Sequence, residues 1–442
     1  MEAISIKEPN PASRLRRWPR VSEAATEEDW RKRLVASWRG VRPRDSAWEL
    51  PDLKQFEESL PRAQRTGKEL IAAAVQQREL LGKRQPSQKA KEVMETLAKH
   101  LSDGKTRELI GMKLTLTNAQ ALGSADVDEA DRNYVVTGFL GEGSRAVVLE
   151  VTEEFTNKPY AMKLIRTPMS PVGRNAAARG LASLMATVGT MEETTAMLQA
   201  VGTTSPSEAA ETRGLAVCAG IATIKGVPFV MECPSGYALS EVQLMERFKG
   251  DLAGIFGPMN PLPVEAKVYA GRRLLLEVLQ MQRAGFSHND LKLSNFFMRD
   301  DGSFLLGDFG AGTLIGQPLD SLNGLTPQYA ELELGAFTVD DNPFRVPPVV
   351  DEKSDMWSLG LCLYRIFTDG RLPYGLMESR NPVETLKTLA EQNVSPKTLR
   401  LGLMEANVPY VWQDLIMDLL NVERRNRINA VEVAANYINL VY

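Results

Sequence analysis

The sequence has few of the residues that bind structural zinc or build disulfide frameworks. Its 442 residues include 3 cysteines (Cys218, Cys233, Cys362) and 2 histidines (His100, His288), with no CxxC or HExxH motif. These shortages exclude a disulfide scaffold and any mechanism that needs several histidines, and they argue against a zinc site. Cys218 and Cys233 are expected either to pair in an oxidising compartment or to stay as free buried thiols.

Long apolar runs and an excess of one charge are also absent. The longest apolar stretch, residues 215–231, is broken by glycine, lysine and proline and lacks the ~18 uninterrupted residues of a membrane span. The opening residues, MEAISIKEPNP, contain no secretory signal, a pattern that a trimmed sequence would also give. With 52 Lys and Arg against 56 Asp and Glu, the charge argues neither for nor against nucleic acid. We predict no nucleic-acid partner, and a monomer.

Tryptophan and arginine are concentrated at the start of the chain. Four of the 6 tryptophans lie in the first 48 residues, and arginines are interleaved with them over residues 14–44. If residues 26–39 are helical, Trp30, Leu34 and Trp38 share one face. Two interpretations stay open for residues 14–44: contact with an anionic membrane surface or a partner, and burial of the apolar face against the main domain.

Three further helices are predicted over residues 53–60, 67–82 and 87–101. We expect them to bury their apolar faces against the main domain, and the alternative is contact with a membrane surface. From residue 134 short β-branched runs predict antiparallel strands, and after residue 271 the patterns are mostly helical. The predicted strands are 134–140, 146–151 and 160–165, and the predicted helices are 274–282, 355–367 and 411–420.

Two segments in the strand-rich part have the composition of a phosphate site. Gly141, Glu142, Gly143 and Ser144 form a glycine-rich turn, where backbone N–H groups approach anions closely. Alone this signal is weak, because glycines are common at hairpin turns. In the next predicted strand, alternation places Ala161 and Lys163 on one face, so that the ammonium group lies under the turn.

The strongest signal is the pair of segments FSHNDLKLSN (286–295) and FLLGDFG (304–310). Asp290, Asn295 and Asp308 offer the oxygen ligands that Mg²⁺ prefers, and they could orient a hydroxyl group. A turn at residues 299–302 would fold Asp308 back beside Asn295.

These motifs, in this order, resemble the eukaryotic protein kinase family from about residue 134 onward. Further similar segments are TPQYAELE (326–333), SDMWSLG (354–360) and RRNR (424–427). Within this family the chain is most similar to apicomplexan rhoptry kinases. The features that carry this similarity are HNDLK, FLLGDFG, YAELEL, the lengthened stretch between residues 333 and 355 and the arginine-rich extension. The resemblance implies an α+β, bilobal protein-kinase fold, with a helical N-terminal extension (1–130), a β-rich small lobe (131–247) and a helical large lobe (248–442).

The resemblance also implies roles for single residues. Lys163 would bind ATP phosphates and be held by a glutamate, with Glu193 chosen over Glu192. Asp290 would accept or orient the substrate hydroxyl proton, Lys292 would steady the transferred group, and Asn295 and Asp308 would ligate Mg²⁺. His288 would pack, Asp355 would hold the catalytic-loop backbone, and Glu333 would form a buried ion pair with Arg427. The remaining nucleotide contacts would come from the glycine turn, Val148, Ala161 and the hinge residues Met245, Glu246 and Phe248.

Two residues depart from the family pattern. Ala146 replaces the third glycine, which predicts a weaker grip on the nucleotide. Asn289 replaces the arginine that pairs with an activation-loop phosphate, so Thr313, Ser321 or Thr326 would gain little from phosphorylation there. The expected function is ATP- and Mg-dependent phosphorylation of Ser/Thr in proteins, including host proteins after secretion from rhoptries into the host cell or vacuole. The alternatives are a pseudokinase scaffold and a cytoplasmic location.

Overall fold

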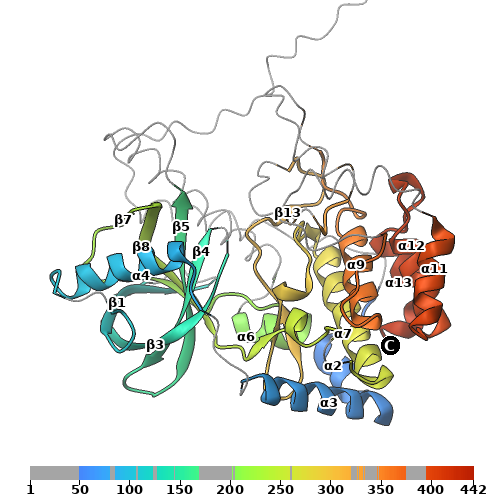
Figure 1. Ribbon diagram of the computed structural model, residues 1–442, viewed down its shortest axis with the longest axis horizontal. Helices are drawn as coiled ribbons and strands as arrows, with labels where there is room; N and C mark the ends of the chain where they lie inside the picture. Colours follow the sequence, from blue (N-terminus) through green and yellow to red (C-terminus); the bar gives the residue numbers. More distant parts are fainter. Residues whose placement is uncertain are drawn as a thin grey trace, which may run out of the picture.

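The computed structural model describes the chain from residue 49 onward, with gaps. The described residues are 49–79, 85–105, 108–122, 127–143, 145–168, 202, 205–258, 261–319, 326, 328–331, 333, 346, 348–374 and 395–442. They form a strand-rich small lobe and a helical large lobe (Figure 1). The predicted Trp/Arg-rich helix over residues 26–39 lies outside the described residues.

The small lobe is built on one antiparallel sheet of eight strands. The strand order is β2-β1-β3-β4-β5-β8-β6, β7 pairs with β8, and a β1–β6 pairing joins the two sides of the sheet. The strands predicted from short β-branched runs correspond to β3, β4 and β5 and are confirmed. The bounds are β1 (Lys113–Ala121), β2 (Val127–Asp128), β3 (Arg132–Glu142), β4 (Ala146–Glu153), β5 (Pro159–Pro168), β6 (Gly220–Ile224), β7 (Val230–Cys233) and β8 (Gly236–Glu246).

The large lobe has α7 (Val264–Arg283) at its centre, with α9 (Met356–Phe367) and α12 (Tyr410–Leu419) packed on it. Gly271 of α7 faces the Trp412 ring, and a Cβ atom at Gly271 would lie 3.0 Å from it, so the small residue permits this close packing. The three predicted helices are confirmed, although α7 begins ten residues earlier than its predicted start. Among the described residues, this lobe also has the helices α11 (Pro396–Glu405) and α13 (Ala430–Asn436).

Short elements connect the lobes and carry the loops of interest. β9 (Gly250–Asp251), β11 (Phe296–Met298) and β12 (Phe304–Leu306) form a small sheet, and β10 (Phe286–Ser287) pairs with β13 (Thr313–Leu314). Single helical turns are α6 (Pro206–Glu208), η2 (Ala209–Arg213), η3 (Leu252–Gly254), η4 (Leu293–Asn295), η5 (Arg424–Asn426) and η6 (Ile438–Leu440).

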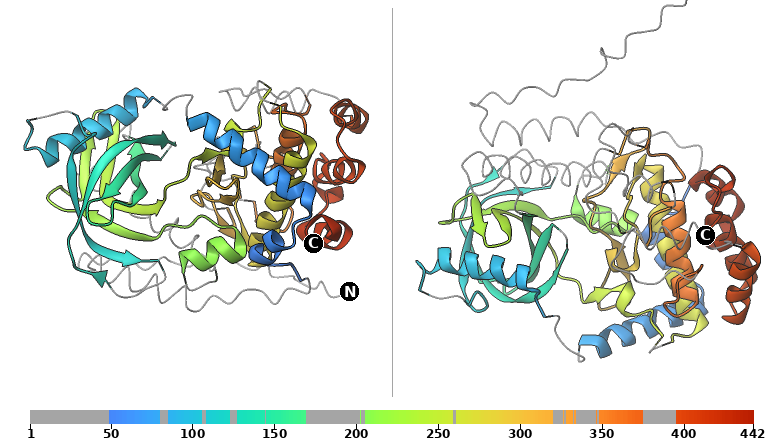
Figure 2. Two further views of the ribbon diagram at one scale, coloured as in Figure 1. Left: turned by 90° about the horizontal axis from the view of Figure 1, so that it is seen from below. Right: turned by 45° about the horizontal axis from the view of Figure 1, so that its top comes forward.

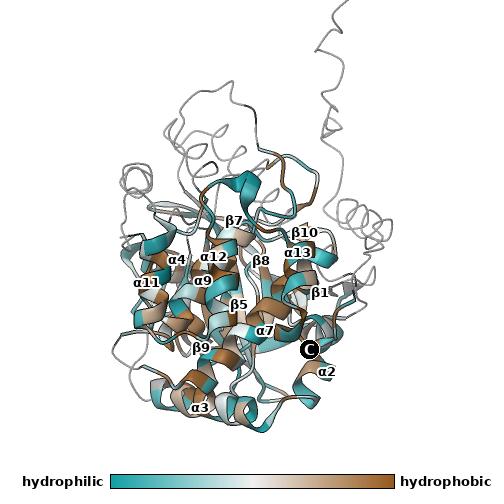
Figure 3. Cartoon of the chain, turned by 90° about the vertical axis from the view of Figure 1, so that its right-hand side faces the viewer, coloured by the Kyte–Doolittle hydropathy of each residue, from teal (hydrophilic) through white to brown (hydrophobic). Residues whose placement is uncertain are grey.

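The three helices before residue 102 bury their apolar faces, as predicted, but on different lobes (Figure 2). Helices α2 (Leu53–Glu58) and α3 (Arg62–Glu79) pack on α7, and Figure 3 shows apolar residues on both α3 and α7. Helix α4 (Gln88–Leu101) begins at the N-cap Ser87 and shares a core with the small-lobe strands. Where the structure describes the chain, no helix has the length and apolarity of a membrane span. All three cysteines are buried and form no disulfide bond, so Cys218 and Cys233 do not pair with each other.

Candidate active site

The buried ammonium group of β5 meets the aspartate of the Asp-Phe-Gly segment. Lys163 Nζ lies 3.0 Å from Asp308 Oδ1, although the two residues are 145 positions apart. The lysine side chain is 11% exposed and the aspartate side chain 44% exposed. Lys163 lowers the pKa of Asp308 to about 2, because a nearby positive charge favours the ionised carboxylate. The cleft therefore holds an ionised carboxylate that remains accessible to a ligand.

A second cluster centres on the buried carboxyl group of Asp290. Lys292 Nζ lies 2.6 Å from Asp290 Oδ2, and Asn295 Nδ2 donates a 2.8 Å hydrogen bond to the Asp290 carbonyl oxygen. Thr326 binds both charged groups: its N–H donates to Asp290 Oδ1 at 3.0 Å, and its hydroxyl accepts from Lys292 at 2.8 Å. Burial raises the pKa of Asp290 above its ordinary value, and Lys292 opposes that shift.

The β11–β12 hairpin joins the two clusters. Phe296 pairs with Leu306, and Gly307 N–H donates a 2.9 Å hydrogen bond to the Asn295 carbonyl oxygen. This register places Asn295 beside the backbone that leads into Asp308, as the predicted turn required. No group of three or more His, Cys, Asp or Glu side chains suited to a metal occurs in the part of the chain that the structure describes. One ionised carboxylate and one amide fit Mg²⁺ that takes its other oxygen ligands from phosphates and water.

Buried hydrogen bonds fix the backbone of residues 288 and 289, which lead into Asp290. Asp355, at the start of α9, is fully buried and accepts from the N–H groups of His288 and Asn289, both at 2.8 Å. Gln282 of α7 donates to the same carboxylate at 2.7 Å. His288 is itself fully buried, and its Nε2 lies 3.0 Å from the Gly307 carbonyl oxygen. His288 is thus a packing and hydrogen-bonding residue, as expected from the sequence.

The predicted nucleotide contacts on the strands share one face of the sheet. Val148 pairs with Lys163, and Ala161 pairs with Met245. Directly paired residues lie on the same side, and so do residues two apart on a strand, so all four line the face that carries the ammonium group.

The glycine turn is the hairpin between β3 and β4. Gly141 pairs with Val148, and Gly143 N–H donates a 2.9 Å hydrogen bond to the Ala146 carbonyl oxygen. Ser144 lies outside the described residues, as do Glu192 and Glu193.

A contact between the glycine turn and α4 was not predicted. The Glu142 carboxylate accepts hydrogen bonds from the Ser87 N–H at 3.0 Å and from the Ser87 hydroxyl at 2.6 Å. The sequence identified Ser87 as the start of a helix, but nothing in it indicated a partner 55 positions away. The extension thus contacts the predicted phosphate-binding turn directly.

The side chains of two predicted hinge residues contact the β11–β12 hairpin. Glu246 forms an ion pair with Arg299, with Nη2 and Oε2 2.6 Å apart, and the Phe248 ring stacks on Phe297 with 5.5 Å between centroids. Because these side chains are engaged, contact with a nucleotide at 246 and 248 would come from backbone groups.

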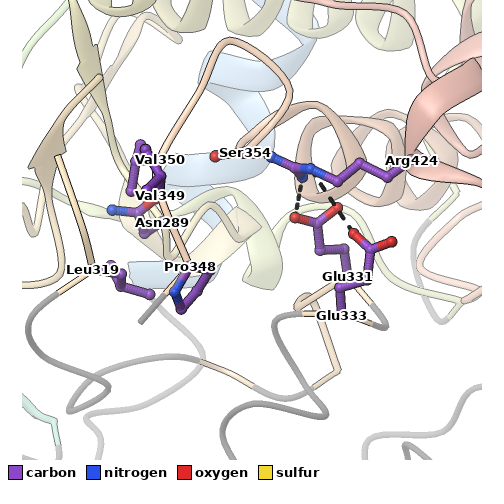
Figure 4. Close-up of a pocket in the computed structure, with 9 residues that line it drawn as sticks. All are labelled: Asn289, Leu319, Glu331, Glu333, Pro348, Val349, Val350, Ser354 and Arg424. Carbon is purple, nitrogen blue, oxygen red and sulfur yellow. Dashed lines mark hydrogen bonds and ion pairs between the residues drawn. The ribbon is translucent and has the colours of Figure 1, made fainter. Parts of the chain in front are cut away.

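The predicted ion pair between Glu333 and Arg427 is wrong, because Glu331 occupies that place. Glu331 is buried and pairs with Arg424, as Figure 4 shows. It also pairs with Arg427, which directly follows the η5 turn. The Glu333 side chain is 65% exposed and lies 3.9 Å from Arg424 Nε. The two glutamates are two positions apart, and the family pattern alone did not decide which of them turns inward.

Comparison with known proteins agrees with this geometry. Residues 244–438 match the protein kinase domain family. The chain has the protein-kinase fold. The chain is similar to the serine/threonine-protein kinase Nek3 of Mus musculus, 27% identical over 241 residues, and to the serine/threonine-protein kinase ROP18 of Toxoplasma gondii, 24% identical over 315 residues. These matches cover 53% and 67% of the chain, but only 37% and 49% of the two relatives, so the chain spans less than half of either.

Solved structures show the same bilobal fold. The ROP18 kinase domain in complex with AMP-PNP and sucrose has a TM-score of 0.58 at 18% identity. ROP2 from Toxoplasma gondii, described as a virulence factor with a protein-kinase fold and no enzymatic activity, has a TM-score of 0.56 at 15% identity. Both comparisons cover 85% of this chain and 95% of the other. The chain is therefore similar in fold to rhoptry kinases, one of which is described as having no enzymatic activity.

Proposed function

We propose that this kinase domain transfers the γ-phosphoryl group of ATP to Ser/Thr hydroxyls of proteins. The observation that carries the proposal is the joining of two clusters, Lys163 with Asp308 and Asp290 with Lys292 and Asn295, through the β11–β12 hairpin. Phosphoryl transfer needs positioning and charge neutralisation above all, and these five side chains supply both.

Magnesium-bound ATP would supply the phosphoryl group. Lys163 would neutralise nucleotide phosphates, and Asn295 and Asp308 would hold the metal. Asp290 would orient the substrate hydroxyl and take its proton while the hydroxyl oxygen bonds to the γ-phosphorus and ADP leaves. Burial raises the pKa of Asp290 and so makes this carboxylate a better proton acceptor. Lys292 would offset the charge on the transferred group. A lysine two residues after the aspartate favours Ser/Thr over Tyr in this family.

Incorporation of labelled γ-phosphate into a generic basic protein tests the proposal. The wild type should transfer phosphate, and Asp290→Ala should lose most of this activity while it still binds nucleotide. Equal background labelling by both proteins would contradict the proposed phosphoryl-transfer activity. It would favour the second candidate function, a pseudokinase that binds a target protein with nucleotide as a structural ligand. Ala146 in the glycine turn and the fold shared with ROP2 support that candidate.

Location and partners extend the proposal. Similarity to rhoptry kinases supports a rhoptry protein that is secreted and acts on host or vacuolar proteins as a monomer. Residues 14–44 would bind anionic lipid through arginine and tryptophan. Co-sedimentation with vesicles containing phosphatidylserine tests this last point, because deletion of residues 14–44 should abolish it.

A further inference from the structure

The residues after the Asp-Phe-Gly segment are bonded on one side to β10. Strand β13 pairs with this short strand, and Ile315 N–H donates a 2.9 Å hydrogen bond to the Gly285 carbonyl oxygen. On the other side lie residues 348–350, which come from the lengthened stretch after Glu333. The segment 311–319 is therefore held between two parts of the chain.

Three backbone hydrogen bonds attach residues 348–350 to this segment. Gly316 N–H donates to the Val350 carbonyl oxygen at 2.7 Å, and Val350 N–H donates to the Gln317 carbonyl oxygen at 2.9 Å. Leu319 N–H donates to the Pro348 carbonyl oxygen, also at 2.9 Å. The pattern is a short antiparallel bridge centred on residues 318 and 349.

Apolar packing strengthens the same contact. Leu319 and Val350 are each 3% exposed and form one cluster, against which Ile315 packs. Figure 4 shows Leu319, Pro348 and Val350 on one side of a small cavity that Asn289 also lines. Where the family places an arginine and a phosphate, this chain thus has apolar side chains and an amide.

Asn289 holds the start of the segment without a charge. Its Nδ2 donates a 2.9 Å hydrogen bond to the Ala311 carbonyl oxygen, and its Oδ1 accepts from the Ser287 hydroxyl at 2.9 Å. The positively charged side chain that lines the cavity is Arg424, and it already forms ion pairs with Glu331 and Asp351. A phosphate placed there would meet these carboxylates, so the cavity disfavours it.

We propose that residues 348–350 are a positioning segment that fixes the activation segment in place of a phosphate. Three contacts take the place of the arginine–phosphate pair of the family pattern. They are the backbone hydrogen bonds to residues 316–319, the Leu319–Val350 contact and the hydrogen bonds of the Asn289 amide. Thr326, farther along the same segment, contacts Asp290 and Lys292, so this anchorage bears on the catalytic residues. The expected change in kcat/KM rests on the proposed function, whereas the anchoring of residues 316–319 by residues 348–350 does not.

The test compares Val350→Pro with a matched control, Val349→Pro. The first change removes the hydrogen bond to Gln317, whereas the Val349 N–H donates none in the described part of the chain. Val350→Pro should speed hydrogen exchange of the Gly316 and Leu319 amides about tenfold and lower kcat/KM for a basic protein by a similar factor. Affinity for AMP-PNP should change less than about twofold, and the control should resemble the wild type throughout.

Phosphatase treatment should leave wild-type kcat/KM within about twofold. A tenfold loss on this treatment, or unchanged exchange in Val350→Pro, would overturn the proposal. Leu319→Pro removes the bond to Pro348 and replaces Val350→Pro if that variant does not fold. If the wild type transfers no phosphate, the proposed function fails, but the exchange comparison still decides whether residues 348–350 hold the segment.

Discussion

Removal of the buried carboxylate at residue 331 should destabilise the large lobe far more than the same change two residues later. Glu331 is 7% exposed and pairs with both Arg424 and Arg427, and the Arg427 side chain is 2% exposed. Removing one partner of a buried ion pair costs roughly 3–5 kcal/mol, because the other charge is left buried. Glu331→Gln keeps the shape of the side chain and removes only the charge.

The matched control is Glu333→Gln. This carboxylate is 65% exposed and lies 3.9 Å from Arg424, so its loss should cost at most about 1 kcal/mol. Unfolding by urea, followed by tryptophan fluorescence, measures both values, since Trp357 packs near Arg427. Equal destabilisation by the two variants, or a larger effect at Glu333, would refute the assignment of the buried ion pair.

Three further predictions concern the pH dependence, the extension and the catalytic hairpin. Burial raises the pKa of Asp290, and only its ionised form can accept the proton, so kcat/KM should fall on acidification at a pH above the ordinary aspartate pKa of 3.8. A pH profile in which kcat/KM falls only below pH 3.8 would contradict this prediction. Ser87→Ala removes a hydroxyl bond to Glu142 and should raise KM for ATP about threefold at unchanged kcat, whereas an unchanged KM would separate α4 from nucleotide binding. Gly302→Ala should lower stability by more than about 2 kcal/mol in thermal unfolding, because the new Cβ would lie 2.3 Å from an α3 carbonyl oxygen. The control Gly226→Ala has a similar positive φ but open space around the new Cβ, so it should cost only about 1–2 kcal/mol. Equal losses of stability in the two variants would contradict the packing argument.

The sequence predicted the fold where local patterns and spaced motifs agreed. Short β-branched runs identified β3, β4 and β5, and the apolar run of residues 355–367 identified α9. The turn at residues 299–302 was predicted to fold the chain back as a hairpin, which would bring Asp308 beside Asn295. The prediction that the helices before residue 102 pack on the domain also followed from their apolar faces.

Other features depend on contacts between distant positions, which no local pattern encodes. The choice between Glu331 and Glu333 depends on which carboxylate meets two arginines about 90 positions later. The bond from Ser87 to Glu142 and the bridge from residues 348–350 to 316–319 join segments that have no shared periodicity. The distribution of α2, α3 and α4 over both lobes is likewise set by tertiary packing.

Nucleotide binding with and without Mg²⁺ tests the central claim most directly. If Asp308 and Asn295 hold a metal beside the Lys163 ammonium group, Asp308→Asn should weaken binding of Mg–AMP-PNP at least about tenfold and leave binding of metal-free AMP-PNP nearly unchanged. Calorimetric titration of wild type and variant measures both affinities. Equal affinities of the two proteins for Mg–AMP-PNP would contradict the account.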